Sequence, residues 1–222
     1  MKRVVRLCAR GACAFAALLL PALAPATPIS RADLVSLCAD AEDQAQCARL
    51  VEAKQMRAVS RFVERDGSEL RVQLVPYGVS VFRDTDSALG GGTAYAVWDY
   101  LADLDTLVLF TTRGERTGFL LLQRKGGGEY PLPSEPVVAP DQHHFATADV
   151  CAQGCDNEVA VWRIGRDGAR KEATWKPPAD WTDVTVAWRG ANAIAIEYAV
   201  ANDTQPRTVE RRLDDASWVR VR

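Results

Sequence analysis

From Glu69 onward, hydrophobic and polar residues alternate in short runs separated by turns, and this pattern limits the chain to a fold made mainly of antiparallel strands. The alternation begins in Glu69 to Val75, where Leu70, Val72 and Leu74 lie between polar neighbours, as in a strand with one buried face. Nearly every later segment has the composition of a strand or a turn. We therefore expect a mostly β domain over residues 61–222.

Three stretches of this region share one order of elements: Ala96 to Glu135, Val137 to Pro177 and Val184 to Arg222. Each combines a short strand, a tight turn, a strongly apolar strand, a polar loop, a third strand, a turn rich in glycine or aspartate and a fourth strand. Arg61 to Thr85 is a candidate for a degenerate first unit. Four strands at a period of about 40 residues are typical of a propeller blade.

The repeat predicts propeller-like four-stranded units in a small or incomplete propeller, or alternatively in an open, strongly twisted sheet or a sandwich. If the units are blades, the 152–158 loop and His143 lie at the rim. The residues that then point into buried sheet interfaces are Phe145, Val161, Ile194 and Ile196.

One segment carries a resemblance to a known class of repeat. Val138-Ala-Pro-Asp-Gln-His-His-Phe-Ala-Thr-Ala, followed by Asn157-Glu-Val-Ala-Val-Trp-Arg-Ile, resembles the blade pattern of WD40-like and TolB-like β-propeller repeats. The chain is also similar to uncharacterised exported bacterial proteins that share its Trp98-Asp-Tyr-Leu and Ala-Pro-Asp segments. The resemblance covers residues 95–222, and residues 137–164 best. It implies a repeat-built β fold that serves binding, and it carries over no catalytic residue; where a WD40 blade ends in Trp-Asp, this chain has Trp162-Arg163.

Residues 1–26 have the pattern of a signal peptide. Met1 to Arg10 contain basic residues and no acid, and Gly11 to Ala24 is almost entirely apolar and ends in small residues. The apolar run is shorter than the roughly 20 residues of a permanent membrane helix. We expect cleavage before Thr27, with a cut before Pro25 as the alternative, and a periplasmic or secreted domain without a stable membrane anchor.

The cysteines that follow the predicted signal peptide are Cys38, Cys47, Cys151 and Cys155. An even number of cysteines in an exported chain predicts disulfides. Four cysteines permit three pairings, and the spacing favours the local one, Cys38 with Cys47 and Cys151 with Cys155. We interpret the second pair as a loop staple, because its spacing differs from the thioredoxin-like motif and no strand–helix–strand pattern surrounds it.

The first pairing requires a break in the helical segment, residues 27–60. In one unbroken helix the two Cα atoms would be roughly 13 Å apart, beyond the ~7 Å that a disulfide tolerates. Ser30, with Asp33 three residues later, resembles a capping box, and Asp43 is placed to cap a second helix. The sequence therefore predicts a short helical hairpin joined by Cys38 and Cys47.

The charge of the chain limits its partners. Residues 1–26 hold four basic and no acidic residues, so their removal takes the net charge from −2 to −6. Nucleic acid and anionic membranes are poor partners for such a chain, whereas a protein or an envelope polymer remains possible. No motif for a cofactor or a metal occurs: His143 and His144 are the only histidines, and they lack a zinc-type spacing.

Two groups of residues are candidates for function. Trp175 and Trp181 flank Pro177-Pro178 in a predicted loop, which makes them our candidates for an exposed binding surface. The second group is acidic and could bind Ca²⁺ through oxygen ligands or supply a carboxylate pair for hydrolysis, although turn aspartates have the same pattern. We expect a binding or interaction module of a bacterial envelope, with a hydrolase as the alternative. The acidic group is Asp84, Asp86, Asp99, Asp103 and Asp105.

Overall fold

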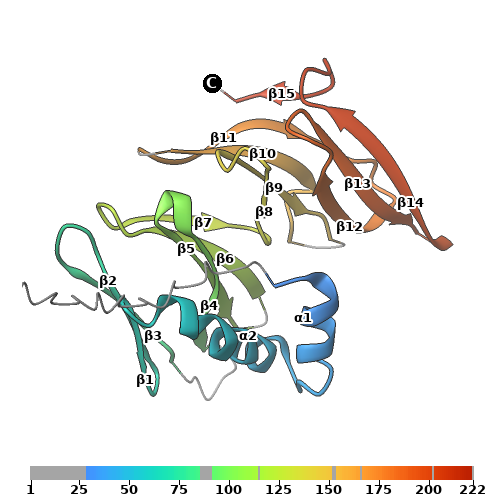
Figure 1. The fold of residues 1–222 in the computed structure, drawn as a ribbon. Coiled ribbons are helices and arrows are strands. Elements are labelled where there is room, and N and C mark those ends of the chain that lie inside the picture. The colour runs from blue at the N-terminus through green and yellow to red at the C-terminus, as the bar shows by residue number, and fades with distance from the viewer. Residues whose placement is uncertain are drawn as a thin grey trace, which may run out of the picture.

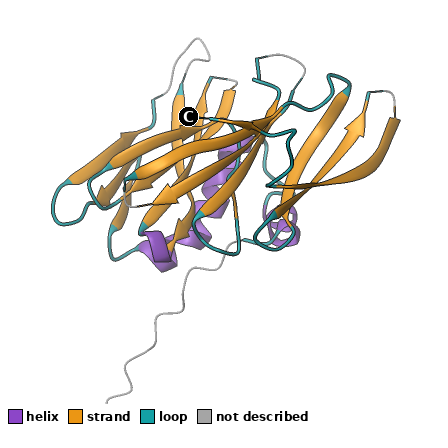
Figure 2. Cartoon of the chain, turned by 90° about the horizontal axis from the view of Figure 1, so that it is seen from above, coloured by secondary structure: helices purple, strands orange, loops and turns teal. Residues whose placement is uncertain are grey.

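The computed structural model describes residues 29–85, 92–114, 116–151, 154–165, 167–201 and 203–221. Strands make up most of these residues (Figure 1, Figure 2), so the predicted mostly β fold is confirmed. The predicted signal peptide and Asp86 lie outside the described residues. The strands are β1 (Val63–Asp66), β2 (Glu69–Gln73), β3 (Val79–Arg83), β4 (Thr93–Leu101), β5 (Thr106–Arg113), β6 (Arg116–Gln123), β7 (Gly128–Leu132), β8 (Val137–Val138), β9 (His144–Asp149), β10 (Glu158–Gly165), β11 (Gly168–Trp175), β12 (Trp181–Trp188), β13 (Ala193–Val200), β14 (Asp203–Arg212) and β15 (Val219–Arg220).

A helical hairpin precedes the strands, as predicted. Helix α1 (Arg31–Leu37) begins after Ser30, whose side chain accepts a hydrogen bond from the amide of Asp33 at 3.1 Å. Helix α2 (Gln44–Val59) begins after Asp43, which caps the amide of Gln46 at 2.7 Å. The Cys38–Cys47 disulfide joins the two helices with its Cα atoms 5.0 Å apart. Within the described ranges, no helix has the length and apolarity of a membrane span.

The described strands form four antiparallel sheets: sheet 1 (β1–β3), sheet 2 (β4–β7), sheet 3 (β8–β11 with β15) and sheet 4 (β12–β14). Apart from β15, each sheet is a meander in which neighbouring strands are consecutive in the chain. Sheet 2 and the β8–β11 part of sheet 3 have the four strands that the repeat predicts, while sheets 1 and 4 have three. The described strands do not close into a barrel or a propeller.

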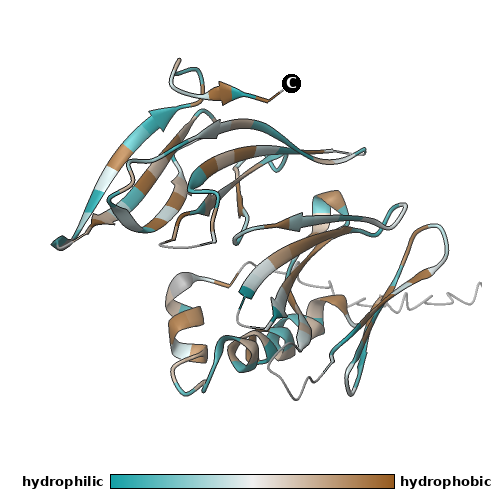
Figure 3. Cartoon of the chain, turned by 180° about the vertical axis from the view of Figure 1, so that it is seen from behind, coloured by the Kyte–Doolittle hydropathy of each residue, from teal (hydrophilic) through white to brown (hydrophobic). Residues whose placement is uncertain are grey.

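The sheets stack face to face in chain order because the central strands are apolar on both faces. In β5, Leu107 and Leu109 pack with sheet 1, whereas Val108 between them packs with sheet 3. Strand β6 repeats this division, with Leu121 on the sheet 3 side. Side chains of a strand alternate between its faces, so the continuous apolar runs fill two interfaces. Figure 3 shows these hydrophobic bands in the middle of the molecule and a largely hydrophilic β14.

Sheets 3 and 4 share a third hydrophobic cluster, which contains Val161, Ile194 and Ile196. These residues and Phe145 are each at most 3% exposed. The four positions that the blade alignment assigns to sheet interfaces are therefore buried as predicted.

The last strand departs from the repeat. The alignment assigns the C-terminal residues to the third unit, but β15 pairs with β11 of sheet 3 instead, through Ala173 opposite Arg220. Trp218, directly before β15, is 5% exposed and packs in the cluster between sheets 3 and 4. Burial of this large side chain directs the end of the chain across the interface, and the third unit is left with three strands.

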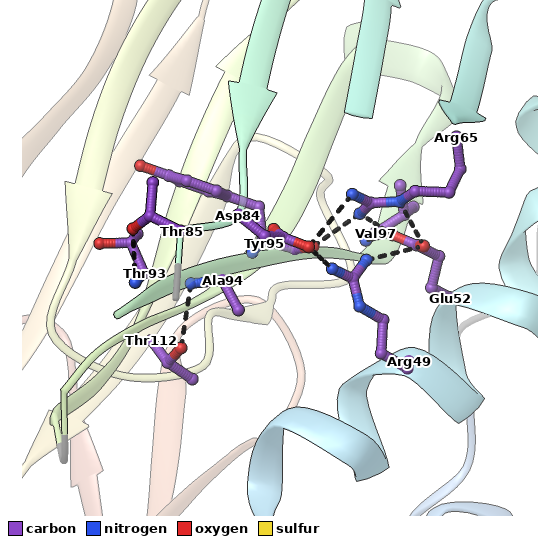
Figure 4. Close-up of polar contacts among 10 residues, drawn as sticks. All are labelled: Arg49, Glu52, Arg65, Asp84, Thr85, Thr93, Ala94, Tyr95, Val97 and Thr112. Atoms are coloured by element: carbon purple, nitrogen blue, oxygen red, sulfur yellow. Dashed lines mark hydrogen bonds and ion pairs between the residues drawn. The ribbon is translucent and has the colours of Figure 1, made fainter. Parts of the chain in front are cut away.

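A network of four charged side chains fixes α2 to the sheets (Figure 4). Glu52, from α2, accepts hydrogen bonds from Arg49 at 3.0 Å and from Arg65 of β1 at 2.9 and 2.7 Å. Asp84, which follows β3, forms ion pairs with the same two arginines. The side chains of Glu52, Arg65 and Asp84 are at most 18% exposed. Two cations and two anions thus pair where water has little access.

The same network caps the outer edge of β4, an edge strand of sheet 2. Glu52 accepts the amide of Val97 at 2.8 Å, and Asp84 accepts the amide of Tyr95 at 2.9 Å. Arg65 donates to the carbonyl of Tyr95 at 2.6 Å. An edge strand leaves a row of peptide groups without strand partners, and charged side chains take that place here. The edge of β4 is therefore held in register directly beside Trp98 and Asp99.

Candidate functional site

A cavity of about 320 Å³ lies where α1, β4 and the connection from β7 to β8 meet. Its walls are mostly apolar, and its volume is in the range of small-molecule sites. The residues that line it are Ile29, Leu34, Trp98, Asp99, Leu101, Glu135, Pro136, Val137, Val138 and Gln142.

A bulge in β4 brings two adjacent side chains into this cavity. Val97 pairs with Leu109, but Asp99 pairs with Val108, so Trp98 is the extra residue. Neighbouring side chains of a regular strand point to opposite faces, and a bulge redirects them. Both Trp98 and Asp99 consequently line the same cavity.

Asp99 is the distinctive polar group of the cavity. Its carboxyl group accepts the amide of Tyr100 at 2.7 Å, and no cationic side chain pairs with it in the described part of the chain. Burial raises the pKa of Asp99 above its ordinary value of 3.8, and the bond from Tyr100 opposes that shift only in part. Desolvation without a countercharge disfavours the ionised form.

Trp98 is held rigidly beside it. The indole nitrogen donates to Oε1 of Glu135, at 2.7 Å. The ring stacks on Phe110 with centroids 5.7 Å apart and makes a T-shaped contact with Phe119, with centroids 5.5 Å apart. Glu135 lies in the connection between sheets 2 and 3, so this hydrogen bond also fixes one wall of the cavity.

Helix α1 supplies another wall, through Leu34 and the preceding Ile29. Seven residues are too few for a stable isolated helix. The disulfide from Cys38 to α2 therefore keeps α1 in place. Because Glu52 links α2 to Val97 of β4, the helix and the bulge are positioned by one connected set of contacts.

The predicted acidic group does not converge on one point. Asp84 belongs to the network around Glu52. Asp103 and Asp105 line a separate cavity of about 410 Å³, together with His143. Asp105 is already engaged there, because Arg124 donates to it at 2.5 Å and the hydroxyl of Tyr100 at 2.8 Å. Asp99 alone among the described members faces the cavity under α1.

The histidines have separate surroundings. His144 Nδ1 lies 2.6 Å from Asp141, and its Nε2 lies 3.4 Å from Glu172. Burial alone would raise the pKa of Asp141, but the hydrogen bond from His144 and two backbone amides lower it overall. These contacts hold the turn before β9, as a structural role predicts. In the described part of the chain, no three histidine, cysteine or acidic side chains gather as metal ligands.

The prediction that Trp175 lies on an exposed surface is wrong. Trp175 ends β11 and is 8% exposed, because it packs between sheets 3 and 4 and the guanidinium of Arg211 covers its ring at 4.1 Å. Trp181 begins β12 and stacks on Tyr198 with centroids 3.4 Å apart. It is partly buried and lines a cavity of about 970 Å³, so a binding role for Trp181 stays a prediction.

The local cysteine pairing is confirmed for the second bridge as well. Cys151 and Cys155 form a disulfide with Cα atoms 5.7 Å apart. Gly154, at φ +84, provides the turn between them.

Sequence reasoning missed Glu135 as a site residue. Glu135 is a single acid in the connection between two strands, and no local pattern marks its contact with Trp98, 37 positions away. The bulge at Trp98 could not be predicted either, because the register of a strand depends on its partner strand.

Comparisons with known proteins find no match: no family model, no curated protein and no solved structure is detectably similar to this chain. Function must therefore be inferred from the geometry of the site.

Proposed function

We propose that this chain is a small-molecule binding domain of the bacterial envelope and that the cavity beside Asp99 is its ligand site. One observation carries the proposal: a strand bulge turns the carboxyl group of Asp99, which pairs with no cationic side chain in the described part of the chain, into a mostly apolar cavity beside α1. A pocket with apolar walls and few polar groups is the usual form of a ligand site. Bulges that re-aim a side chain are also over-represented beside functional sites.

The location and the architecture belong to the same proposal. The disulfides support an oxidising compartment, and the signal-like residues 1–26 favour the periplasm or secretion. The chain-order stack of meanders supports an open relative of the WD40-like or TolB-like propeller repeats. A protein or envelope polymer partner is a further possibility, with Trp181 as its candidate contact.

The test fills the cavity with a larger side chain on α1. Leu34 lines the cavity, whereas Val35 on the same helix is 67% exposed, so Leu34→Trp fills the site and Val35→Trp is the matched control. A small-molecule panel is screened by thermal shift against the mature chain and both variants. We expect at least one compound to stabilise the wild type and Val35→Trp but not Leu34→Trp. Compounds that stabilise all three proteins equally would contradict the assignment of the site.

A hydrolase is the second candidate, because Glu135 lines the same cavity as Asp99. A carboxylic acid with a raised pKa can donate a proton while a second carboxylate activates water. Of the acidic group predicted between Asp84 and Asp105, only Asp99 would belong to this carboxylate pair. Turnover in a glycoside and ester panel, lost in both Asp99→Asn and Glu135→Gln, would support this reading; turnover that survives both changes would exclude it.

A further inference from the structure

We infer that the ligand of the Asp99 cavity is a small organic ammonium ion, an inference that rests on the proposed function. The charged side chains that line the cavity in the described part of the chain are all acidic. Among lining residues whose side chains the structure describes, the charged groups are Asp99 and Glu135, and none is basic. A ligand carboxylate or phosphate would meet like charge in this cavity.

The unmatched group is Asp99. Its carboxyl group has a backbone amide as its hydrogen-bond donor and no ion pair in the described part of the chain. Asp99 is partly buried, and a carboxylate that is partly removed from water is stabilised by a countercharge. A cation in the cavity supplies it, and the ion pair forms in surroundings where screening by water is weak.

The rest of the wall selects an organic cation over a metal ion. Leu34, Pro136 and Val138 offer methyl and methylene surface to a substituted nitrogen. A hard metal ion needs about six oxygen ligands, and this wall offers few. Trp98 adds an aromatic ring, and indole is the side chain that attracts ammonium groups most strongly. Its N–H is already bonded to Glu135 and Phe110 stacks against the ring, so a ligand meets the ring surface that these contacts leave open.

Because the ligand pairs with the charged form of Asp99, its affinity should depend on pH in a direction that can be stated. The ligand pairs with ionised Asp99, whereas burial favours the protonated form in the empty site. Binding therefore releases a proton below the raised pKa. Affinity rises with pH until Asp99 is ionised in the free protein and is constant above that point.

The experiment compares charged probes with a neutral one of the same shape. Isothermal titration calorimetry measures choline, butylammonium and the carbon analogue of choline, in which a quaternary carbon replaces the nitrogen, against the mature chain. We expect at least one ammonium probe to bind about tenfold or more tightly than the neutral analogue. Asp99→Asn should remove that preference, and Leu34→Trp should abolish binding, whereas Val35→Trp should behave as wild type.

The outcomes separate this inference from the proposed function. Equal binding of both ammonium probes and the neutral analogue, all blocked by Leu34→Trp, would overturn the ammonium inference and leave the ligand site standing. The absence of saturable binding by either ammonium probe at millimolar concentration would also overturn it. Ammonium binding that Leu34→Trp leaves intact would contradict both, because the ligand would then occupy another site.

Discussion

Substitution of Glu52 should lower the stability of the fold strongly, because its carboxylate links helix α2 to strands β1 and β4 and also binds Arg49. It accepts four hydrogen bonds: one from Arg49, two from Arg65 and one from the amide of Val97. In Glu52→Gln the side chain keeps its length but loses its charge, and the new NH₂ group faces the donors that the carboxylate accepted. Breaking a buried ion pair by removal of one partner costs about 3–5 kcal/mol.

We expect a loss near the lower end, about 3 kcal/mol. Asp84 still pairs with both guanidinium groups in the variant, and Arg49 is one-third exposed, with 33% of its side-chain surface accessible. For a chain of this size, each kcal/mol corresponds to about 2–4 °C, so the melting temperature should fall by about 6–12 °C. Urea unfolding with disulfides intact, followed by circular dichroism, gives the free energy directly.

The matched control is Lys54→Gln on the same helix. Lys54 lies 3.6 Å from Asp33, and the two side chains are 49% and 60% exposed. Exposed pairs contribute up to about 1 kcal/mol, so this variant should unfold close to wild type. If Glu52→Gln loses no more stability than Lys54→Gln, the network does not hold α2 against β4. The cavity would then not be positioned by the contacts of Glu52.

Two further predictions concern the hydrophobic cluster between sheets 3 and 4 and the Cys38–Cys47 disulfide. Ile196→Ala should lose about 2–5 kcal/mol of unfolding free energy, because the fully buried side chain leaves a cavity between sheets 3 and 4; Val79→Ala, on a residue 54% exposed, should change far less in the same urea series. Similar losses in both would show that the sheet faces are wrongly assigned. Replacing Cys38 and Cys47 by serine should cost about 2–3 kcal/mol for so short a loop and weaken ligand binding by releasing α1. Unchanged calorimetric affinity in that variant would argue against α1 as a wall of the site.

Sequence signals predicted the features that depend on neighbours in the chain. The caps of α1 and α2 are set by Ser30 and Asp43 within three residues. The cysteine pairing followed from spacing and helix geometry, and the strongly apolar strand predicted in the first unit is β5, which the structure shows to be buried on both faces. These features were accessible because each depends on short-range chain geometry or on periodicity.

Long-range contacts were not accessible in the same way. The residues around Glu52 are up to 45 positions apart, and nothing in either segment marks them as partners. The burial of Trp175 followed from the sheet stack and not from the adjacent prolines. Asp99 belongs to the predicted acidic group of five, but its separation from the others depends on a bulge that only the pairing of β4 with β5 reveals.

The proposed function implies that Asp99 is kept in its cavity for a ligand and at a cost to stability. The folded chain holds the Asp99 proton to higher pH than the unfolded chain does, because burial raises the pKa above 3.8. Unfolding therefore releases a proton in that range, and the free energy of unfolding falls as pH rises. Asn keeps the acceptor for the amide of Tyr100 and carries no charge. Asp99→Asn should therefore remove the free-energy cost of burying the charged carboxylate.

The decisive measurement is the free energy of unfolding of the wild type and Asp99→Asn across the pH range, with Asp105→Asn beside them. Asp105 is paired with Arg124 and bonded to the hydroxyl of Tyr100, so its variant should be less stable than wild type at neutral pH. We predict that Asp99→Asn is more stable than wild type at neutral pH, with a difference that shrinks toward zero near about pH 3. A loss of stability in Asp99→Asn at neutral pH, like that of Asp105→Asn, would make Asp99 a structural residue and contradict the proposed site.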